Sequence, residues 1–179
     1  MAKYVALLRG INLGKRQIKM AELRQIFEAE GYQDVRTLLA SGNVVFTAKE
    51  TNATKLRGKI EALIRKEFGF DVPVVLRSQK EIQALIKSDP FKAEKVTPQT
   101  RFYVTFLSEP SKSNLKTPYK SMDSEFAIRE ISDGHVVSVL GPKVGSPDVM
   151  DFLGKEFGSN ITTRNWNTVK KIHAAMDLG

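Results

Sequence analysis

The sequence contains no cysteine and only two histidines, His135 and His173. The absence of cysteine excludes disulfides, thiolate metal sites and cysteine nucleophiles, and it is typical of proteins from a reducing interior. Neither histidine lies in a recognisable nucleophile or base motif. We therefore expect no metal site and no cofactor.

The chain also lacks a long apolar run. No stretch approaches the roughly 20 apolar residues that a transmembrane helix needs. The apolar run at residues 4–8 meets Arg9 at once, so it is too short for the core of a signal peptide. These features predict a soluble, cytoplasmic protein with no membrane partner.

Acidic residues are outnumbered, with 20 Asp and Glu against 28 Lys and Arg, and the formal net charge is +8. The surplus is uneven, because residues 1–90 carry 16 basic against 10 acidic residues while residues 91–179 carry 12 against 10. A field of this sign favours nucleic acid or phosphate-bearing small molecules, and it is equally compatible with solubility alone.

Residues 1–90 have the pattern of a ferredoxin-like domain, in which strands and helices follow the order βαββαβ. Glycine ends each of the first two helices, and Gly42 with Asn43 suits a tight hairpin turn. Thr51 or Asn52 can cap the second helix, and Ser78 with Glu81 forms a capping box for a further helix. The predicted strands are residues 3–8, 35–39, 44–47 and 73–77, and the predicted helices end at Gly31 and Gly69.

The segment 87–100 has two prolines and little apolar content, so we expect a boundary between a lobe of residues 1–90 and a smaller lobe of residues 91–179. Both lobes mix strands and helices, and the predicted fold class is α+β. In the second lobe we expect a strand at 101–107, a hairpin at 125–140, a helix with Ser146 as N-cap and a last helix capped by Thr162 or Thr163. We expect Trp166 and His173 on the apolar face of that helix and His135 to be exposed.

Polar residues follow the first strand and form the turn between the second and third. In the predicted topology the first two strands are parallel, so these two segments lie at the same edge of the sheet. Arg9 and Asn12 are thereby brought toward Ser41 and Asn43.

The predicted start of the last helix is a second polar cluster. Its free N–H groups attract an anion, and Arg164 in the first turn adds a charge and a bidentate donor. Thr163, Asn165 and Asn167 can add further hydrogen bonds. If the lobes face each other across these edges, the cleft suits a phosphate or a carboxylate.

Each cluster also has a purely structural interpretation. Thr163 can serve only as a helix cap and Trp166 only as a core residue, while residues 41–43 can form a plain hairpin turn. Arg9 can pair with a carboxylate such as Glu22. The coincidence of the clusters is what favours a binding site.

Two further features bear on nucleic acid. Basic residues of the second helix lie off its apolar face, either as a solvated surface or as an electrostatic footprint for nucleic acid. A ferredoxin-like sheet that binds RNA carries exposed aromatic residues on its central strands. Tyr4 and Phe46 are the candidates for that role, and neither lies in a motif of that class.

Five segments resemble the bacterial family catalogued as domain of unknown function 1697 (DUF1697). They are LLRGINLG at 7–14, LLASGNVVF at 38–46, DPF at 89–91, VTFL at 104–107 and TTRNWNTV at 162–169. The resemblance implies a bacterial protein with a ferredoxin-like lobe and a second α+β lobe, and it implies no activity and no catalytic residues. The motif residues coincide with the polar clusters and are Arg9, Gly10, Asn12, Ser41, Gly42, Asn43, Thr163, Arg164, Asn165 and Trp166.

The leading hypothesis is a protein that binds a phosphate-bearing ligand, either nucleic acid or a nucleotide, between the lobes near Arg9, Asn43 and Arg164. The alternative is an enzyme that acts on a small anionic substrate in the same cleft, with an Asp or Glu as base. A third possibility is a protein-interaction module, which requires an exposed apolar patch. The sequence leaves the reaction and the oligomeric state open.

Overall fold

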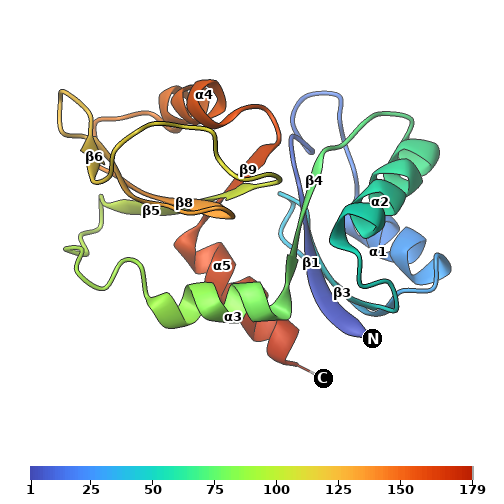
Figure 1. Cartoon of the computed structure of the whole chain (residues 1–179). Coiled ribbons are helices and arrows are strands. Elements are labelled where there is room, and N and C mark those ends of the chain that lie inside the picture. The colour runs from blue at the N-terminus through green and yellow to red at the C-terminus, as the bar shows by residue number, and fades with distance from the viewer. Residues whose placement is uncertain (179) are drawn as a thin grey trace. The chain divides into compact units, whose positions relative to one another are not determined.

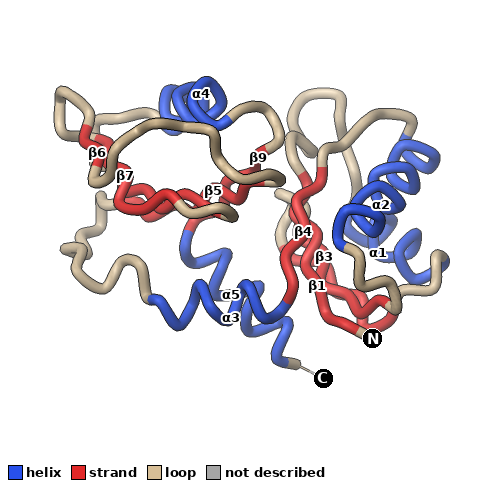
Figure 2. Tube along the Cα trace, in the orientation of Figure 1, coloured by secondary structure: helices blue, strands red, loops and turns tan. Residues whose placement is uncertain are grey.

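The computed structural model describes residues 1–178, which form two compact units. Unit 1 comprises residues 1–87 together with the C-terminal residues from 170 onward, and unit 2 comprises residues 88–169. The described residues contain two antiparallel sheets and five α-helices (Figures 1 and 2). The predicted α+β class is confirmed.

Unit 1 is built on a four-stranded sheet in which every neighbouring pair is antiparallel. The strands are β1 (Ala2–Leu8), β2 (Gln33–Leu38), β3 (Asn43–Ala48) and β4 (Val74–Ser78), in the spatial order β2-β3-β1-β4. Helices α1 (Met20–Ala29) and α2 (Ala53–Phe68) cover one face of the sheet (Figure 1). The chain order of these elements is βαββαβ, as predicted.

The core of unit 1 lies between that face and the two helices. Alternate residues of a strand point to the same face, so every second residue of β1 and β3 enters this core. Phe46 is its aromatic centre, with ring centroids 5.3 Å from Phe27 and 4.9 Å from Tyr32.

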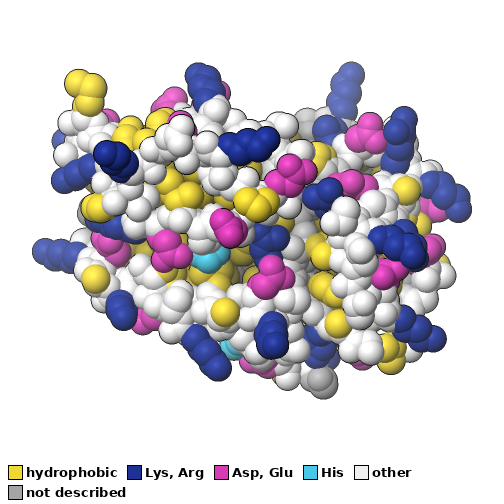
Figure 3. All heavy atoms as spheres, in the orientation of Figure 1, with side chains coloured by type: hydrophobic (Ala, Val, Ile, Leu, Met, Phe, Trp, Pro, Cys, Tyr) yellow, Lys and Arg dark blue, Asp and Glu magenta, His cyan; other side chains and the backbone are white. Residues whose placement is uncertain are grey.

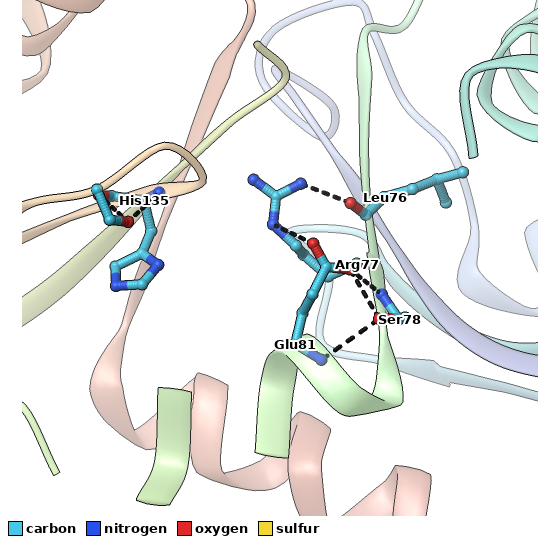
Figure 4. A network of polar contacts seen from close by, with 6 residues as sticks. Leu76, Arg77, Ser78, Glu81 and His135 are labelled. Carbon is cyan, nitrogen blue, oxygen red and sulfur yellow. Dashed lines mark hydrogen bonds and ion pairs between the residues drawn. The ribbon is translucent and has the colours of Figure 1, made fainter. Parts of the chain in front are cut away.

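The helix ends follow the local chemistry of the sequence. The side chain of Asn52 accepts a hydrogen bond from the backbone N–H of Lys55 at 2.9 Å, and Gly69 ends α2 with φ of +80°. The predicted capping box opens α3 (Gln79–Ser88), because Ser78 N donates to Glu81 Oε2 at 2.7 Å and Glu81 N donates to Ser78 Oγ at 3.3 Å (Figure 4).

The C-terminal residues from 170 onward belong to unit 1, whereas we expected residues 91–179 to form one lobe. They are part of α5 (Trp166–Asp177), whose last carbonyls need donors. Lys3 Nζ donates to the carbonyl oxygen of Met176 at 2.8 Å, and Gln79 Nε2 donates to the same oxygen at 3.0 Å. Both donors lie in unit 1, and no local pattern in the sequence predicts either hydrogen bond.

Unit 2 contains a five-stranded antiparallel sheet. In spatial order its strands are β6 (Tyr119–Lys120), β7 (Phe126–Ile131), β8 (His135–Leu140), β5 (Arg101–Leu107) and β9 (Ile161–Asn165). Helix α4 (Ser146–Phe157) packs on this sheet, and Leu107, Ile128, Leu140 and Leu153 are among the buried residues of that core. The predicted hairpin is confirmed as β7 and β8.

Three expectations for unit 2 were wrong. Residues 161–165 form strand β9, so neither Thr162 nor Thr163 caps the last helix. The N-cap of α4 is Gly145 and Ser146 is the first residue of the helix; the hydroxyl of Ser146 accepts a hydrogen bond from Arg101 Nη1 at 3.1 Å. His135 is half-buried, and its Nε2 lies 3.2 Å from Glu130 Oε1.

None of the helices within residues 1–178 combines the length and the apolar character needed to cross a membrane.

Candidate functional site

The end of β1 and the β2–β3 turn meet at one edge of the unit 1 sheet, as the topology predicted. Leu7 pairs with Asn43 in the ladder, and Leu8 N donates to the carbonyl oxygen of Gly42 at 2.9 Å. Asn12 reaches the same turn, since its Nδ2 donates to the carbonyl oxygen of Ala40 at 2.6 Å. We call this region, made of residues 9–19, 39–43 and 69–73, the sheet edge.

Asn12 holds the loop that follows β1. Its Oδ1 accepts from Ile18 N at 2.9 Å, and its backbone N–H donates to the carbonyl oxygen of Arg16 at 2.7 Å. Its φ of +56° is one that asparagine tolerates better than most residues. Both ends of the Asn12 amide are therefore occupied within unit 1, and the side chain shapes the loop.

Ser41 and Asn43 close the turn between β2 and β3. Asn43 is fully buried, and its Nδ2 donates to the carbonyl oxygen of Leu38 at 2.7 Å and to Ser41 Oγ at 3.1 Å. Ser41 is exposed. Of these two predicted ligand residues, Asn43 lies inside the protein and only Ser41 lies on its surface.

Arg9 differs from its neighbours in how its side chain is satisfied. Its backbone N–H donates to the carbonyl oxygen of Pro73 at 3.0 Å. Its Nη1 atom is buried, and within residues 1–178 it has no hydrogen-bond partner. A buried N–H group of a cation costs free energy when it has no acceptor, because it has lost its hydrogen bonds to water and forms none within the protein. An anion at this position would remove that cost.

The loop that contains Arg9 is strongly basic. Residues 9–19 include four cations and no acidic residue: Arg9, Lys15, Arg16 and Lys19. Lys19 approaches Glu22 of α1 at 3.8 Å, but both side chains are largely exposed and such a pair is weak. The loop thus presents a net positive field at the sheet edge.

Arg16 is held in a fixed position beside the segment 69–73. Its Nη2 donates to the carbonyl oxygen of Asp71, and its guanidinium carbon lies 5.2 Å from the centroid of the Phe70 ring. Arg65 at the end of α2 approaches the same aspartate, with Nη1 3.4 Å from Asp71 Oδ1. Two arginines from different elements therefore converge on this segment.

The net charge of the protein resides entirely in unit 1. This unit carries 18 Lys and Arg against 10 Asp and Glu, a net charge of +8, whereas unit 2 carries 10 of each. Lys and Arg side chains, with some acidic groups among them, cover the side of unit 1 that carries α1 and α2 (Figure 3). The difference in charge between the two units is larger than that between residues 1–90 and 91–179, because Lys170 and Lys171 also belong to unit 1.

The second predicted cluster is built differently from our expectation. Arg164 lies in β9 and not in the first turn of a helix, and it is only 7% exposed. Its Nη1 donates to Thr162 Oγ1 at 2.7 Å and to the carbonyl oxygen of Thr163 at 3.0 Å. Burial lowers the pKa of Arg164 to about 10, so the side chain is still a cation at neutral pH. The hydroxyls of Thr163 and Thr105 are 2.8 Å apart across the sheet.

The cap of α5 is Asn165, whose Oδ1 accepts a hydrogen bond from Thr168 N at 2.8 Å. Trp166 is half-buried against Phe91, with ring centroids 5.3 Å apart. Asn167 is exposed in the first turn of the helix. Of the four predicted ligand residues in this cluster, Thr163, Arg164 and Asn165 already hydrogen-bond within unit 2.

This cap leads to a first prediction. Asn165→Ala removes the acceptor for Thr168 N, and we expect the free energy of unfolding to fall by about 0.5–2 kcal/mol. Asn165→Asp keeps an acceptor and adds a negative charge that the helix N-terminus favours, so it should be close to neutral. Denaturant unfolding followed by the fluorescence of Trp166, the next residue, measures both. Equal losses in the two variants would contradict the capping role.

Arg77 is a partly buried cation that our sequence reasoning missed. It lies in β4, its side chain is 11% exposed, and its Nη1 donates to the carbonyl oxygen of Leu76 at 2.6 Å (Figure 4). Burial lowers the pKa of Arg77, and the negative charge of Glu81 opposes that shift. The only signal in the sequence is an arginine that directly precedes a capping box at the end of an apolar strand.

A groove of about 340 Å³ lies elsewhere in unit 1, between α1 and α2. Its lining includes Ile26, Leu63, Glu30 and Lys66, and it contains none of the predicted site residues. The sheet edge remains the place where the sequence motifs and the unsatisfied charge coincide.

The two sheets define a two-unit α+β protein with a basic first unit and an electrically neutral second unit. The family described as "Protein of unknown function (DUF1697)" matches residues 1–133, and the chain belongs to that family. The match covers four of the five segments that resemble the family and ends before β9, although the resemblance seen in the sequence extended to residue 169.

The solved structures with a similar fold include the conserved bacterial protein SP0830 from Streptococcus pneumoniae. The two chains share 24% sequence identity, the alignment covers 98% of each, and the TM-score is 0.71. At this identity the likeness concerns the fold alone. No curated protein matches the chain.

Proposed function

We propose that the protein binds a phosphate-bearing ligand at the sheet edge of unit 1, with Arg9 as the main contact. The observation that carries this proposal is the buried Nη1 of Arg9, which lacks an acceptor within residues 1–178. Phosphate oxygens are strong acceptors that suit an arginine donor. Lys15 and Arg16 in the same loop supply further positive charge.

The other residues of the sheet edge have supporting roles in this proposal. Asn12 fixes the loop against the turn, and Asn43 fixes the turn, so both determine where Arg9 lies. Ser41 is exposed at the same turn. The cluster at residues 163–167 is not needed, because most of its polar side chains bond within unit 2.

We also propose that the first unit is a ferredoxin-like domain. The βαββαβ chain order and the spatial strand order β2-β3-β1-β4 support this assignment. In this arrangement the loop after β1 and the β2–β3 turn share one edge. The location of the proposed site is thus a consequence of topology.

The proposal predicts opposite effects of one substitution on binding and on stability. Arg9→Met keeps most of the side-chain length but removes the unsatisfied charge, so the free energy of unfolding should stay constant or rise. Affinity for inorganic pyrophosphate should fall roughly tenfold or more, because hydrogen bonds to charged groups are worth about 1.5–3 kcal/mol. Calorimetric titration and denaturant unfolding provide the two measurements.

Arg24→Met is the matched control, since Arg24 is exposed on α1 and pairs with Glu28 at 2.7 Å. It changes the net charge of unit 1 equally but should alter pyrophosphate affinity by less than about twofold. The proposal fails if both variants weaken binding to the same extent, or if the wild-type protein binds no pyrophosphate at low salt.

A further inference from the structure

We infer that the ligand of the sheet edge is a single-stranded nucleic acid, with a phosphate at Arg9 and a base stacked on the guanidinium plane of Arg16. This inference rests on the proposed function, because it uses the same loop and the same arginine contact. It adds the class of ligand and a second contact that a simple phosphate does not make.

Arg16 has the properties of a stacking platform. Its guanidinium carbon lies 5.2 Å from the centroid of the Phe70 ring and its Nη2 donates to the carbonyl oxygen of Asp71, while the residue as a whole is exposed. A guanidinium plane supported in this way offers its outer face to a second flat group. Bases of single strands stack on arginine planes as well as on aromatic rings.

The side chain of Arg16 and the backbone of Arg9 both bond to one short segment. Arg9 binds the carbonyl oxygen of Pro73 through its backbone N–H, and Arg16 binds that of Asp71 through its side chain. Two residues of extended chain span about 7 Å, so these anchoring points are near each other. The proposal places a phosphate at Arg9 and a neighbouring base of the same strand at Arg16.

The charge of unit 1 favours a polyanion over a single phosphate. Its net charge of +8 exceeds what one small ligand neutralises, and the charge continues from the loop to Arg65 and Lys66 at the end of α2. A strand that contacts several such cations releases counterions from each neutralised phosphate. Binding should therefore weaken steeply as salt is raised.

The sheet itself does not provide an alternative base platform. Tyr4 is 6% exposed and Phe46 is fully buried, and both rings belong to the core beneath α1 and α2. The RNA-binding mode in which aromatic residues of the central strands stack on bases is thus closed to these two residues. At the sheet edge, the guanidinium of Arg16 is an exposed flat group.

The test compares a labelled single-stranded oligonucleotide with an abasic oligonucleotide of the same length, in RNA and DNA forms, by fluorescence anisotropy. Arg16→Lys keeps the charge but loses the plane, so affinity for the base-containing strand should fall roughly fivefold or more. Affinity for the abasic strand should change by less than about twofold. Arg24→Lys is the control for an equivalent change at an exposed helical site.

Phe70→Leu gives a second and independent variant. It preserves an apolar contact with the core but removes the ring under the guanidinium, and it should show the same dependence on bases. Thermal unfolding of each variant verifies that the fold is retained. The expected result is that both variants lose affinity for the base-containing oligonucleotide and keep their affinity for the abasic one.

Other outcomes overturn the inference in distinguishable ways. If Arg16→Lys leaves the affinity for both oligonucleotides unchanged, or lowers both affinities equally, the stacking of a base on Arg16 is excluded while phosphate binding at Arg9 stands. If pyrophosphate binds but no oligonucleotide does, the ligand is a small phosphate compound. If neither binds, the proposed function fails as well. If the protein cosediments with anionic vesicles and binds no oligonucleotide, the basic loop binds a membrane surface.

Discussion

Gly42→Ala is expected to lower the free energy of unfolding of unit 1 by about 2–5 kcal/mol. A Cβ atom at this position would lie 2.6 Å from Ile11 Cδ1 and 2.9 Å from Leu8 Cβ, both inside van der Waals contact. The backbone also has φ of +83°, which costs an L-residue about 1–2 kcal/mol. Overpacking of this kind typically adds about 1–3 kcal/mol. The two costs act together because the turn cannot move away from the loop without breaking the Leu8–Gly42 bond.

Gly31→Ala provides a matched control for the backbone term. Gly31 has φ of +92°, and no atom lies within 4 Å of a Cβ built at that position. The Gly31→Ala variant should therefore lose only the backbone contribution to the free energy of unfolding, about 1–2 kcal/mol. The measurement is urea unfolding monitored by amide hydrogen exchange of β3, because β3 lies in unit 1 whereas Trp166 lies in unit 2. If both variants lose the same free energy of unfolding, the close packing at Gly42 contributes nothing to stability.

The elements of unit 1 were predictable because their signals are local. Gly31 and Gly69 have the positive φ values that end helices, and Asn52 and the Ser78–Glu81 pair satisfy helix N–H groups within three residues. Each of these interactions depends on sequence neighbours alone. A reader of the sequence can therefore locate them without knowing the tertiary structure.

Residues 161–165 show why β9 was missed. Thr162 and Thr163 are β-branched residues that favour strands, but their hydroxyls also suit a helix cap, and the cap interpretation was chosen. The true cap, Asn165, stands only two residues later and was assigned to ligand binding. The run Ile161, Thr162, Thr163 was the available signal for a strand.

The candidate site was predictable in location but not in detail. Topology alone placed Asn12 beside the β2–β3 turn, and the hydrogen bond to Ala40 confirms it. Whether a polar side chain is buried, exposed or already bonded depends on tertiary packing. That is why the burial of Asn43 was not predicted and why the unsatisfied Nη1 of Arg9 appears only in the structure.

Phe46→Ala should cause the other large loss, about 3–5 kcal/mol in the free energy of unfolding of unit 1. Phe46 is fully buried in β3, and its ring lies 5.3 Å from that of Phe27, 4.9 Å from that of Tyr32 and 6.0 Å from that of Tyr4. Truncation removes the apolar burial and leaves a cavity that three rings on separate elements cannot fill together. Aromatic pair contacts add about 0.5–1.5 kcal/mol each beyond area burial, so the loss should lie toward the upper end.

Phe46→Leu tests whether shape or mere apolar volume matters at this position. If volume dominates, the leucine variant should lose less than about 1.5 kcal/mol, whereas loss of the ring contacts should make the penalty larger. β3 begins at Asn43, so a cavity at Phe46 should also loosen the turn and weaken pyrophosphate binding at Arg9. Denaturant unfolding and calorimetric titration of both variants separate these effects. A Phe46→Ala variant that unfolds within about 1 kcal/mol of wild type would contradict the role of this ring as the centre of the core.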